Sequence, residues 1–445
     1  MTATNIRQQS RSTIAAKLEG RRRVVIEAVK PEIDCGEFSI QRVVGEAVTV
    51  EADVFADGHD AVEAQLLYRR AGERAWRTVP MQPLGNDRWQ AQFATMELGE
   101  YRYTIEGWVD AFTTWRNAMK KRIDAGQETH VERMAGSILV AAAAKRAKKD
   151  DAKRLKEFAA VIDSTDQDAA SGAALDPALG NLMQTYAEHT YSTRYAKELS
   201  VSVGRERAGF SAWYEIFPRS CSPRPDQHGT FKDCEEWLPY IASMNFDVLY
   251  LPPIHPIGQE FRKGKNNVEK SRPNDVGSPW AIGSGDGGHK SIHPKLGSLK
   301  DFQSLIVAAK QHGLEIALDL AFQCSPDHPY VQEHPSFFCK RADGTIQYAE
   351  NPPKKYQDIY PLDFETDDWR ALWSELKSVI DYWIEQGVLI FRVDNPHTKS
   401  FPFWKWAIAE VKAVHPEVIF LAEAFTRPKV MYRLAKLGFT QSYTY

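Results

Sequence analysis

The stretches FRVDNPH at residues 391–397 and FLAEA at residues 420–424 decide the fold, because each begins as a short apolar strand and places an acid at the strand end. The two acids are Asp394 and Glu423. If the strands are neighbours in a parallel barrel, both side chains open at its C-terminal rim, where such barrels build active sites. Neighbouring strands lie only ~4.8 Å apart, a separation that lets two carboxyl groups approach the roughly 5 to 5.5 Å of retaining glycoside chemistry.

The rest of the second half alternates similar strands with helical patterns, as in a βα architecture. Apolar runs and amphipathic periods predict strands at residues 212–217, 247–252, 314–322, 388–394 and 418–425, and helices at residues 231–244, 299–312, 369–386, 403–414 and 429–437. Residues 441–445 look like the opening of a sixth strand. Two long loops, residues 254–294 and 323–365, interrupt the alternation, and no helix is clear in the first loop.

These elements predict an α/β (TIM) barrel over residues 211–445 that is truncated after about five strands. A closed barrel of this kind has eight strands, and an open five-stranded parallel sheet would expose a long apolar edge. We therefore expect the chain to be the N-terminal part of a longer protein, with the remaining strands beyond Tyr445.

The first half begins with period-two alternation, which is typical of half-buried strands. In one such strand the apolar positions point to the same side: Val48, Val50, Ala52 and Val54. The alternation recurs in short segments with turn residues between them, which predicts an immunoglobulin-like β-sandwich. We assign this domain to residues 1–115 and expect residues 198–210 to complete it.

Residues 116–197 are rich in Ala, Lys and Glu and predict a helical insert, with Leu155, Phe158 and Ile162 on one face. The sequence shows no obvious partner for this apolar stripe, so we predict a dimer surface here and a homodimeric protein. The basic run at residues 145–149 is followed at once by two acids. We interpret it as a solvated helix face and expect no nucleic-acid partner.

Composition is that of an ordinary globular protein of 445 residues, with 43% hydrophobic and 26% charged residues. The net charge of -3 gives no global attraction to nucleic acid or acidic membranes. A run of about 18 apolar residues, which would predict a transmembrane helix, does not occur, and the polar residues 1–23 do not read as a secretory signal. Five cysteines without CxxC spacing argue against a disulfide framework or a zinc site. We expect a cytoplasmic protein without cofactor or metal.

Several motifs of the second half resemble the α-amylase superfamily: HPKLGSLKDF at residues 293–302, GLEIALDL at 313–320, the pair Arg392 and Asp394, and Glu423. Others more closely resemble the bacterial maltosyltransferases that use α-maltose 1-phosphate to extend α-1,4-glucans: RKGKNN at residues 262–267, GSPWAIG at 277–283, QCSPDHP at 323–329 and DNPHTK at 394–399. Each motif alone would be weak, but together they are specific. A sandwich and helical insert ahead of the barrel also match that family's layout.

The resemblance implies that Asp394 is the nucleophile of a retaining maltosyl transfer and Glu423 its acid/base. In such chemistry ionised Asp394 attacks the anomeric carbon, while Glu423 protonates the departing oxygen and later deprotonates the acceptor. Arg392 points to the same face of its strand as Asp394, so we expect it to keep that carboxylate charged and oriented. The alternative for the two acids is a pair of strand-end caps or ion-pair partners.

The resemblance also implies contacts with α-maltose 1-phosphate and an α-1,4-glucan acceptor. The expected positions are Lys263, Gln323, Asp358, Asn395, Asn351 and Tyr356. A phosphate leaving group needs little protonation, so cationic and hydrogen-bonding groups in the two long loops matter more than in an amylase. The alternative for Lys263 is a solvated loop lysine. Gln323-Cys324 stands where many amylases have Asn-His, which removes a common calcium ligand.

Two other functions stay open on the sequence. One is an α-amylase-superfamily hydrolase or a trehalose-forming enzyme acting on α-glucosides. The other is a non-catalytic glycan-binding protein. The superfamily uses a third acid, an Asp after a later strand, and no residue of this chain matches it. We therefore predict that the 445-residue chain by itself is inactive.

Overall fold

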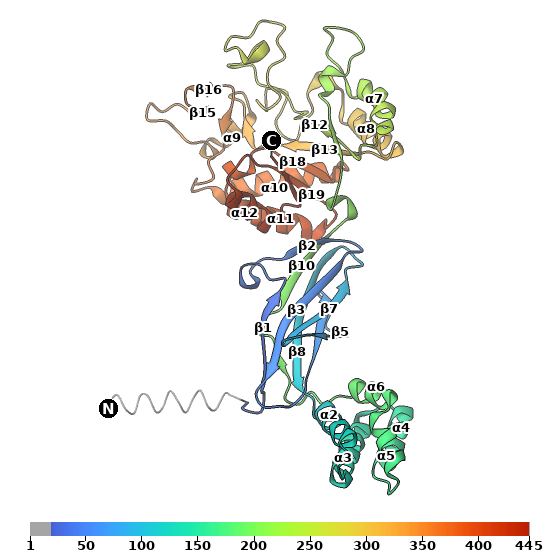
Figure 1. The fold of residues 1–445 in the computed structure, drawn as a ribbon. Helices are drawn as coiled ribbons and strands as arrows, with labels where there is room; N and C mark the ends of the chain where they lie inside the picture. The colour runs from blue at the N-terminus through green and yellow to red at the C-terminus, as the bar shows by residue number, and fades with distance from the viewer. Residues whose placement is uncertain (1–18, 445) are drawn as a thin grey trace, which may run out of the picture. The chain divides into compact units, whose positions relative to one another are not determined.

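The computed structural model describes residues 19–444. Residues 1–18 of the predicted sandwich domain and Tyr445 of the predicted sixth strand lie outside the described residues. The chain divides into two compact units (Figure 1). The first unit holds residues up to Ile40 together with Ala47–Ala94 and Glu100–Val201, and the second holds Gln41–Glu46, Thr95–Gly99 and the residues from Ser202 onward.

Two β-sheets contain most of the strand residues of the first unit. One has the strand order β1 (Val24–Lys30), β3 (Ala47–Ala56), β7 (Arg88–Ala94) and β6 (Gln82–Gly85). The other has the order β2 (Ile40–Val43), β10 (Leu199–Gly204), β8 (Gly99–Val109), β4 (Val62–Arg70) and β5 (Arg77–Pro80), with β9 (Thr193–Arg194) beside β8.

The predicted alternation along β3 is confirmed, because Val48, Val50, Ala52 and Val54 are all buried. The two sheets face each other across aromatic contacts. Tyr68 on β4 stacks on Phe93 of β7 with 4.5 Å between ring centroids, and Phe93 also lies 6.0 Å from Tyr103 of β8. The inward residues of both sheets thus form one apolar layer between them.

Five helices follow β8: α2 (Ala111–Asp124), α3 (His130–Arg146), α4 (Lys149–Ile162), α5 (Gln167–Leu175) and α6 (Pro177–Thr185). Helix α2 begins ahead of the predicted insert because the Asp110 side chain caps it, accepting a hydrogen bond from the backbone N–H of Thr113. Helices α2 and α3 approach closely at Gly136, where a Cβ atom would lie only 2.0 Å from the Trp115 ring.

The dimer argument based on Leu155, Phe158 and Ile162 is wrong. Leu155 and Ile162 are fully buried, and Phe158 packs against the same cluster, which is formed by the helices of this segment. The stripe therefore has its partners within the chain. The apolar side chains that the segment exposes lie elsewhere, mainly on α3.

The second unit contains a six-stranded sheet in which every neighbouring pair is parallel. Its order is β11 (Trp213–Glu215), β12 (Val248–Leu251), β13 (Glu315–Leu320), β18 (Ile390–Val393), β19 (Ile419–Glu423) and β20 (Gln441–Tyr443). The helices between the strands are α7 (Phe231–Ser243), α8 (Leu299–Gln311), α10 (Trp369–Glu385), α11 (Phe401–Val414) and α12 (Pro428–Lys436). The helices and part of the strand residues form one large apolar core, and Val248, Tyr250, Ala317, Ile390 and Ile419 of the strands form a second, smaller cluster.

The predicted strands and helices of this unit are all present, with ends that differ by one or two residues. Helix α11 starts at Phe401 and not at Phe403, because Ser400 caps it and Pro402 occupies its first turn, where a proline is tolerated. The strands are one or two residues shorter than predicted at most ends, and β18 ends at Val393, directly before Asp394. The sixth strand pairs with β19, so that Tyr443 lies opposite Glu423.

Both long loops carry ordered structure. Between β12 and α8 the described residues form two 3₁₀ turns, Lys265–Asn267 and Pro294–Leu296, so no second helix is found there. The other loop contains β14 (Gln323–Cys324), which pairs with β17 (Tyr360–Pro361), the short helix α9 (Pro329–Glu333), and a hairpin of β15 (Ala349–Asn351) and β16 (Lys354–Tyr356). Among residues 19–444, no helix has both the length and the apolar run that crossing a bilayer requires.

Candidate active site

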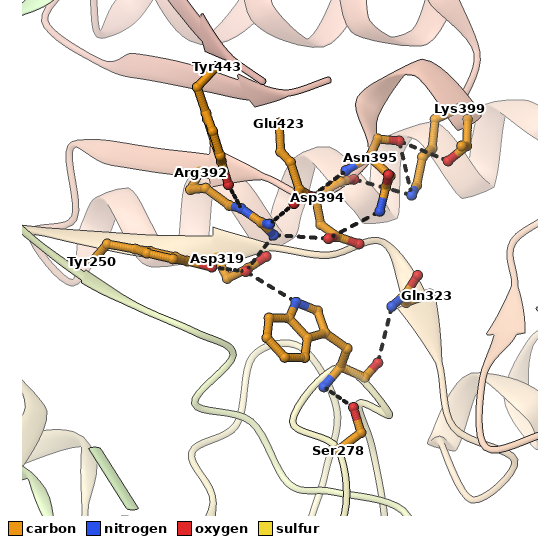
Figure 2. Close-up of polar contacts among 12 residues, drawn as sticks. Tyr250, Ser278, Asp319, Gln323, Arg392, Asp394, Asn395, Lys399, Glu423 and Tyr443 are labelled. Carbon is orange, nitrogen blue, oxygen red and sulfur yellow. Dashed lines mark hydrogen bonds and ion pairs between the residues drawn. The ribbon is translucent and has the colours of Figure 1, made fainter. Parts of the chain in front are cut away.

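Arg392 is the centre of a buried charge cluster at the C-terminal ends of the parallel strands (Figure 2). Its Nη1 lies 2.8 Å from Asp319 Oδ2 and 2.9 Å from Asp394 Oδ1, and its Nη2 lies 2.5 Å from Glu423 Oε1. Its Nε donates to the Tyr443 hydroxyl at 3.1 Å. One guanidinium therefore joins three carboxyl groups from three adjacent strands.

The strand register explains this convergence. Asp319 on β13 lies opposite Arg392 on β18, and β19 runs along the other side of β18. Asp394 follows β18 directly, and Glu423 is the last residue of β19. Parallel strands bring their carboxyl ends to one edge of the sheet, so acids at successive strand ends meet there.

Burial and repulsion determine how readily the carboxyl groups ionise. Burial raises the pKa of Asp319 to about 7, since it outweighs the stabilising charge of Arg392. Burial also raises the pKa of Glu423 to about 7, and the neighbouring Asp394 adds to the rise while Arg392 opposes it. Burial alone would lower the pKa of Arg392, but the attraction of Asp319 and Asp394 raises it. Arg392 therefore stays charged at any pH at which the protein folds.

These environments separate the roles of two carboxyl groups. A pKa of about 7 keeps a substantial fraction of Glu423 protonated near neutral pH, as a general acid requires. Asp394 receives hydrogen bonds from Arg392 Nη1 at 2.9 Å and from the Asn395 side-chain amide at 3.4 Å, which orient its side chain. Arg392 bridges the two carboxyl groups and so keeps them adjacent. The cluster can thus hold an acid beside a nucleophile.

Asp319 had no predicted role, although it lies close to the end of a predicted strand. It is buried, and its Oδ2 accepts hydrogen bonds from the Tyr250 hydroxyl at 2.5 Å and from Trp280 Nε1 at 3.2 Å. Its Oδ1 is buried without a hydrogen-bond partner in the described structure. The sequence signal was an acid at a third strand end, in line with Asp394 and Glu423. Tyr443 had no such signal.

Lys263 is buried, with 5% of its surface exposed, so the alternative of a solvated loop lysine is wrong. Its Nζ lies 3.5 Å from the carbonyl oxygen of Lys355 in the other long loop. Asp358 is also buried, its Oδ1 has no hydrogen-bond partner in the described structure, and burial raises its pKa while Lys263 opposes the rise. The structure thus brings Lys263 and Asp358 into electrostatic contact.

Of the other predicted substrate contacts, Gln323 and Asn395 are linked to the carboxyl cluster by hydrogen bonds, whereas Asn351 and Tyr356 are not. Gln323 donates from Nε2 to the Trp280 carbonyl oxygen at 3.3 Å, and so it joins the site through the residue that touches Asp319 (Figure 2). Asn395 donates from its backbone N–H to Glu423 Oε2 at 3.4 Å. Asn351 and Tyr356 sit in the β15–β16 hairpin, and within residues 19–444 neither has a hydrogen bond to the carboxyl cluster. Asn351 is exposed and Tyr356 half-buried.

His289, Cys324 and His328 form a buried group whose potential metal ligands lie within 4.8 Å of one another. Hydrogen bonds already use both histidines. The Tyr330 backbone N–H donates to His328 Nδ1 at 3.0 Å, which leaves the proton on Nε2 to donate to His289 Nδ1 at 3.0 Å. His289 Nε2 in turn faces the Ala321 carbonyl oxygen at 3.0 Å. In this tautomer His328 Nε2 carries a proton and has no free lone pair to bind a metal. The three side chains therefore fit a structural hydrogen-bond network better than a metal site.

Burial lowers the pKa of His289 to about 4 and that of His328 to about 2, which agrees with two neutral rings. The thiol of Cys324 is also buried, and burial raises its pKa well above the usual range, as for a packed cysteine and not a nucleophile. All five cysteines are free thiols.

Comparison with known proteins gives a consistent result. Residues 22–205 match the family model described as "Alpha-1,4-glucan:maltose-1-phosphate maltosyltransferase, domain N/S". A relative of that name from Chlorobaculum tepidum is 54% identical over 427 residues, which is 96% of this chain and 64% of the relative. One from Cereibacter sphaeroides is 49% identical over 425 residues, or 95% of this chain and 71% of the relative.

A solved α-amylase from Lactobacillus plantarum is 30% identical and covers 52% of this chain and 49% of its own, with a TM-score of 0.41. The chain spans about 64% of the length of the Chlorobaculum relative.

Proposed function

The chain belongs to the α-1,4-glucan:maltose-1-phosphate maltosyltransferase family, and on that premise we propose that the full-length protein moves a maltosyl unit from α-maltose 1-phosphate to the non-reducing end of an α-1,4-glucan, releasing phosphate. The observation that carries the proposal is the pair of Asp394 and Glu423, held side by side by Arg392. Such a pair suits retaining transfer to a sugar acceptor.

The proposed reaction has two displacements. In the first, a carboxylate oxygen of Asp394 attacks the anomeric carbon, the bond from that carbon to the phosphate oxygen breaks, and Glu423 can give its proton to the departing oxygen. In the second, the acceptor hydroxyl attacks the same carbon, its proton passes to Glu423, and the bond to Asp394 breaks. Each displacement inverts the configuration, so the product keeps the α-linkage.

The buried cation Lys263 supports a phosphate donor. A lysine ammonium is a compact charge suited to phosphate oxygens, and Lys263 is held near the Lys355 carbonyl in a loop above the strand ends. Asp358 presents a buried oxygen without a partner in the described structure, as expected of a group that awaits a sugar hydroxyl. We assign substrate contacts to Lys263, Asp358, Gln323 and Asn395, and weaker ones to Asn351 and Tyr356.

Release of inorganic phosphate tests the proposal. The full-length protein is expected to liberate phosphate from maltose 1-phosphate, faster when a maltooligosaccharide is present, and to lengthen that oligosaccharide by two glucose units. Starch hydrolysis without phosphate release would instead identify a hydrolase. Binding of glucan with neither reaction would identify a glycan-binding protein.

We further infer that the parallel sheet is part of an eight-stranded barrel in the full-length protein, since its six strands follow one another in parallel order with helices between most of them. We also propose an immunoglobulin-like topology for the sandwich, a helical insert at about residues 116–197, a catalytic domain from about residue 211, and a cytoplasmic location, where free thiols stay reduced. A crystal structure of the full-length protein tests the domain assignment, and cell fractionation tests the location.

A homodimer through α3 is the proposed oligomer. Val131, Met134 and Ile138 are 71%, 46% and 69% exposed, and their spacing places them on one face of α3. Introducing charges with V131E and I138E together is expected to convert the dimer to a monomer in size-exclusion chromatography with light scattering. The matched control is V414E, which changes an equally exposed valine on α11. A monomeric wild type, or a dimeric double variant, would refute this interface.

A further inference from the structure

The turn after β18 is held by a lysine that the proposed reaction does not use. Past Asp394 the backbone is left-handed at Asn395, with φ 43° and ψ 54°, and continues as a 3₁₀ turn over Pro396–Thr398. Left-handed backbone is unfavourable for residues other than Gly, although Asn tolerates it best. Such a conformation persists only where the surroundings hold it.

Lys399 provides that support. Its Nζ lies 3.3 Å from the carbonyl oxygen of Asp394 and 3.4 Å from that of Asn395 (Figure 2). These carbonyls belong to the two peptide groups that flank the Asn395 Cα, so a single ammonium restrains both. Thr398 also donates to the Asn395 carbonyl, from Oγ1 at 2.8 Å, but it is exposed and uncharged.

Asn395, which Lys399 restrains, is hydrogen-bonded to both reacting carboxyl groups. The Asn395 side-chain amide reaches Asp394 Oδ1 at 3.4 Å, and its backbone N–H reaches Glu423 Oε2 at 3.4 Å. A rotation of either peptide group would therefore move a donor away from the proposed nucleophile or from the proposed acid.

We propose that Lys399 is a positioning residue that holds Asn395 in its left-handed conformation and thereby aligns Asp394 and Glu423. This inference rests on the proposed function, because it concerns the same two carboxyl groups. Lys399 acts through its neighbours and needs no contact with the substrate.

The charge of Lys399 gives the proposal a specific signature. The ionisable groups that interact with Lys399 are Asp394, Asp319, Glu423, Arg392 and His397. Burial lowers the pKa of Lys399, while Asp394, Asp319 and Glu423 attract its charge and oppose the lowering. Without that charge the protonated forms of Glu423 and Asp319 become more favourable, so their pKa values rise. Removing Lys399 should therefore move the limb of the pH–rate profile that Glu423 controls to higher pH.

Kinetics of K399M in the full-length protein test the proposal. We expect kcat/KM to fall about 10²-fold, the size of loss that a small misplacement of reacting groups causes, and the pH profile to shift upward. K399R keeps the charge and is expected to lose rate without the shift. The matched control is K412M, which removes another half-buried lysine, one that donates to Thr440 Oγ1 at 3.0 Å. Its pH profile should stay at the wild-type position.

Two donors distinguish failure of this inference from failure of the proposed function. Release of fluoride from α-maltosyl fluoride requires a site that displaces a leaving group from the anomeric carbon but no phosphate chemistry. If the wild-type protein releases fluoride from α-maltosyl fluoride but no phosphate from maltose 1-phosphate, the proposed function is wrong. The role of Lys399 is then tested by comparing fluoride release by K399M and by the wild type. Wild-type kcat/KM and pH profile in K399M with both donors would overturn the positioning role. If K399M does not fold, K399Q carries the same expectation and the same overturning result.

Discussion

Replacing Asp394 by Asn in the full-length protein will lower phosphate release from maltose 1-phosphate by about 10⁴-fold or more, because a neutral amide cannot replace a carboxylate nucleophile. The amide oxygen can still accept the hydrogen bond that Arg392 Nη1 now gives to Asp394 Oδ1. D394N should therefore fold normally and bind the donor. Steady-state phosphate release at saturating maltooligosaccharide measures the loss.

The matched control for D394N is D381N. Asp381 lies on α10, is partly exposed and pairs with Lys377, whose Nζ is 2.7 Å from Asp381 Oδ2. Its replacement should leave the rate unchanged. If D394N kept a rate within about tenfold of the wild type, a difference of only ~1.4 kcal/mol in the barrier, Asp394 would not be the nucleophile.

Replacing Arg392 by Met will destabilise the protein by about 3 to 5 kcal/mol, the usual cost of leaving buried charges without their partner. Asp319, Asp394 and Glu423 are all buried and share this one guanidinium. Urea denaturation of wild type and variant at pH 8 measures the difference. The cost should shrink on going to pH 5, since protonation then neutralises carboxyl groups that Arg392 no longer compensates.

The control for R392M is R207M. Arg207 also pairs with two carboxylates, at 2.9 Å from Asp247 Oδ1 and 2.7 Å from Glu315 Oε1, but these side chains are partly exposed. Exposed pairs contribute about 0 to 1 kcal/mol, so R207M should cost little at either pH. If R392M lowers the free energy of unfolding no more than R207M does, the three buried carboxyl groups do not depend on the charge of Arg392 for stability.

The strands and helices of the second unit were predictable because their signals are local. Helices α7 and α8 each begin with a capping box, formed by Thr230 with Asp233 and by Ser298 with Asp301, and these residues are neighbours in sequence. The apolar runs of β18 and β19 are similarly short and continuous. The placement of Asp394 and Glu423 at the rim follows from these strands alone.

The roles of other residues were not predictable because their partners are distant in sequence. Asp319 contacts Tyr250, Trp280 and Arg392, which come from three different segments. In the sequence Lys263 is one lysine of a polar loop, and only the folded structure shows that it is buried beside the second long loop. The stripe that includes Leu155 reads as an open face until the neighbouring helices bury it.

Period and strand-end chemistry in the amino-acid sequence thus predict the order of elements and the two principal acids, since these signals depend on residues a few positions apart. The alternation of strands and helices then predicts a parallel sheet. The charge state of those acids depends on the folded structure. Burial raises the pKa of Glu423 while Arg392 opposes the rise, and that balance exists only after β18 and β19 bring their ends together. Ionisation energies in a buried site depend on distance and desolvation, which a linear sequence does not contain.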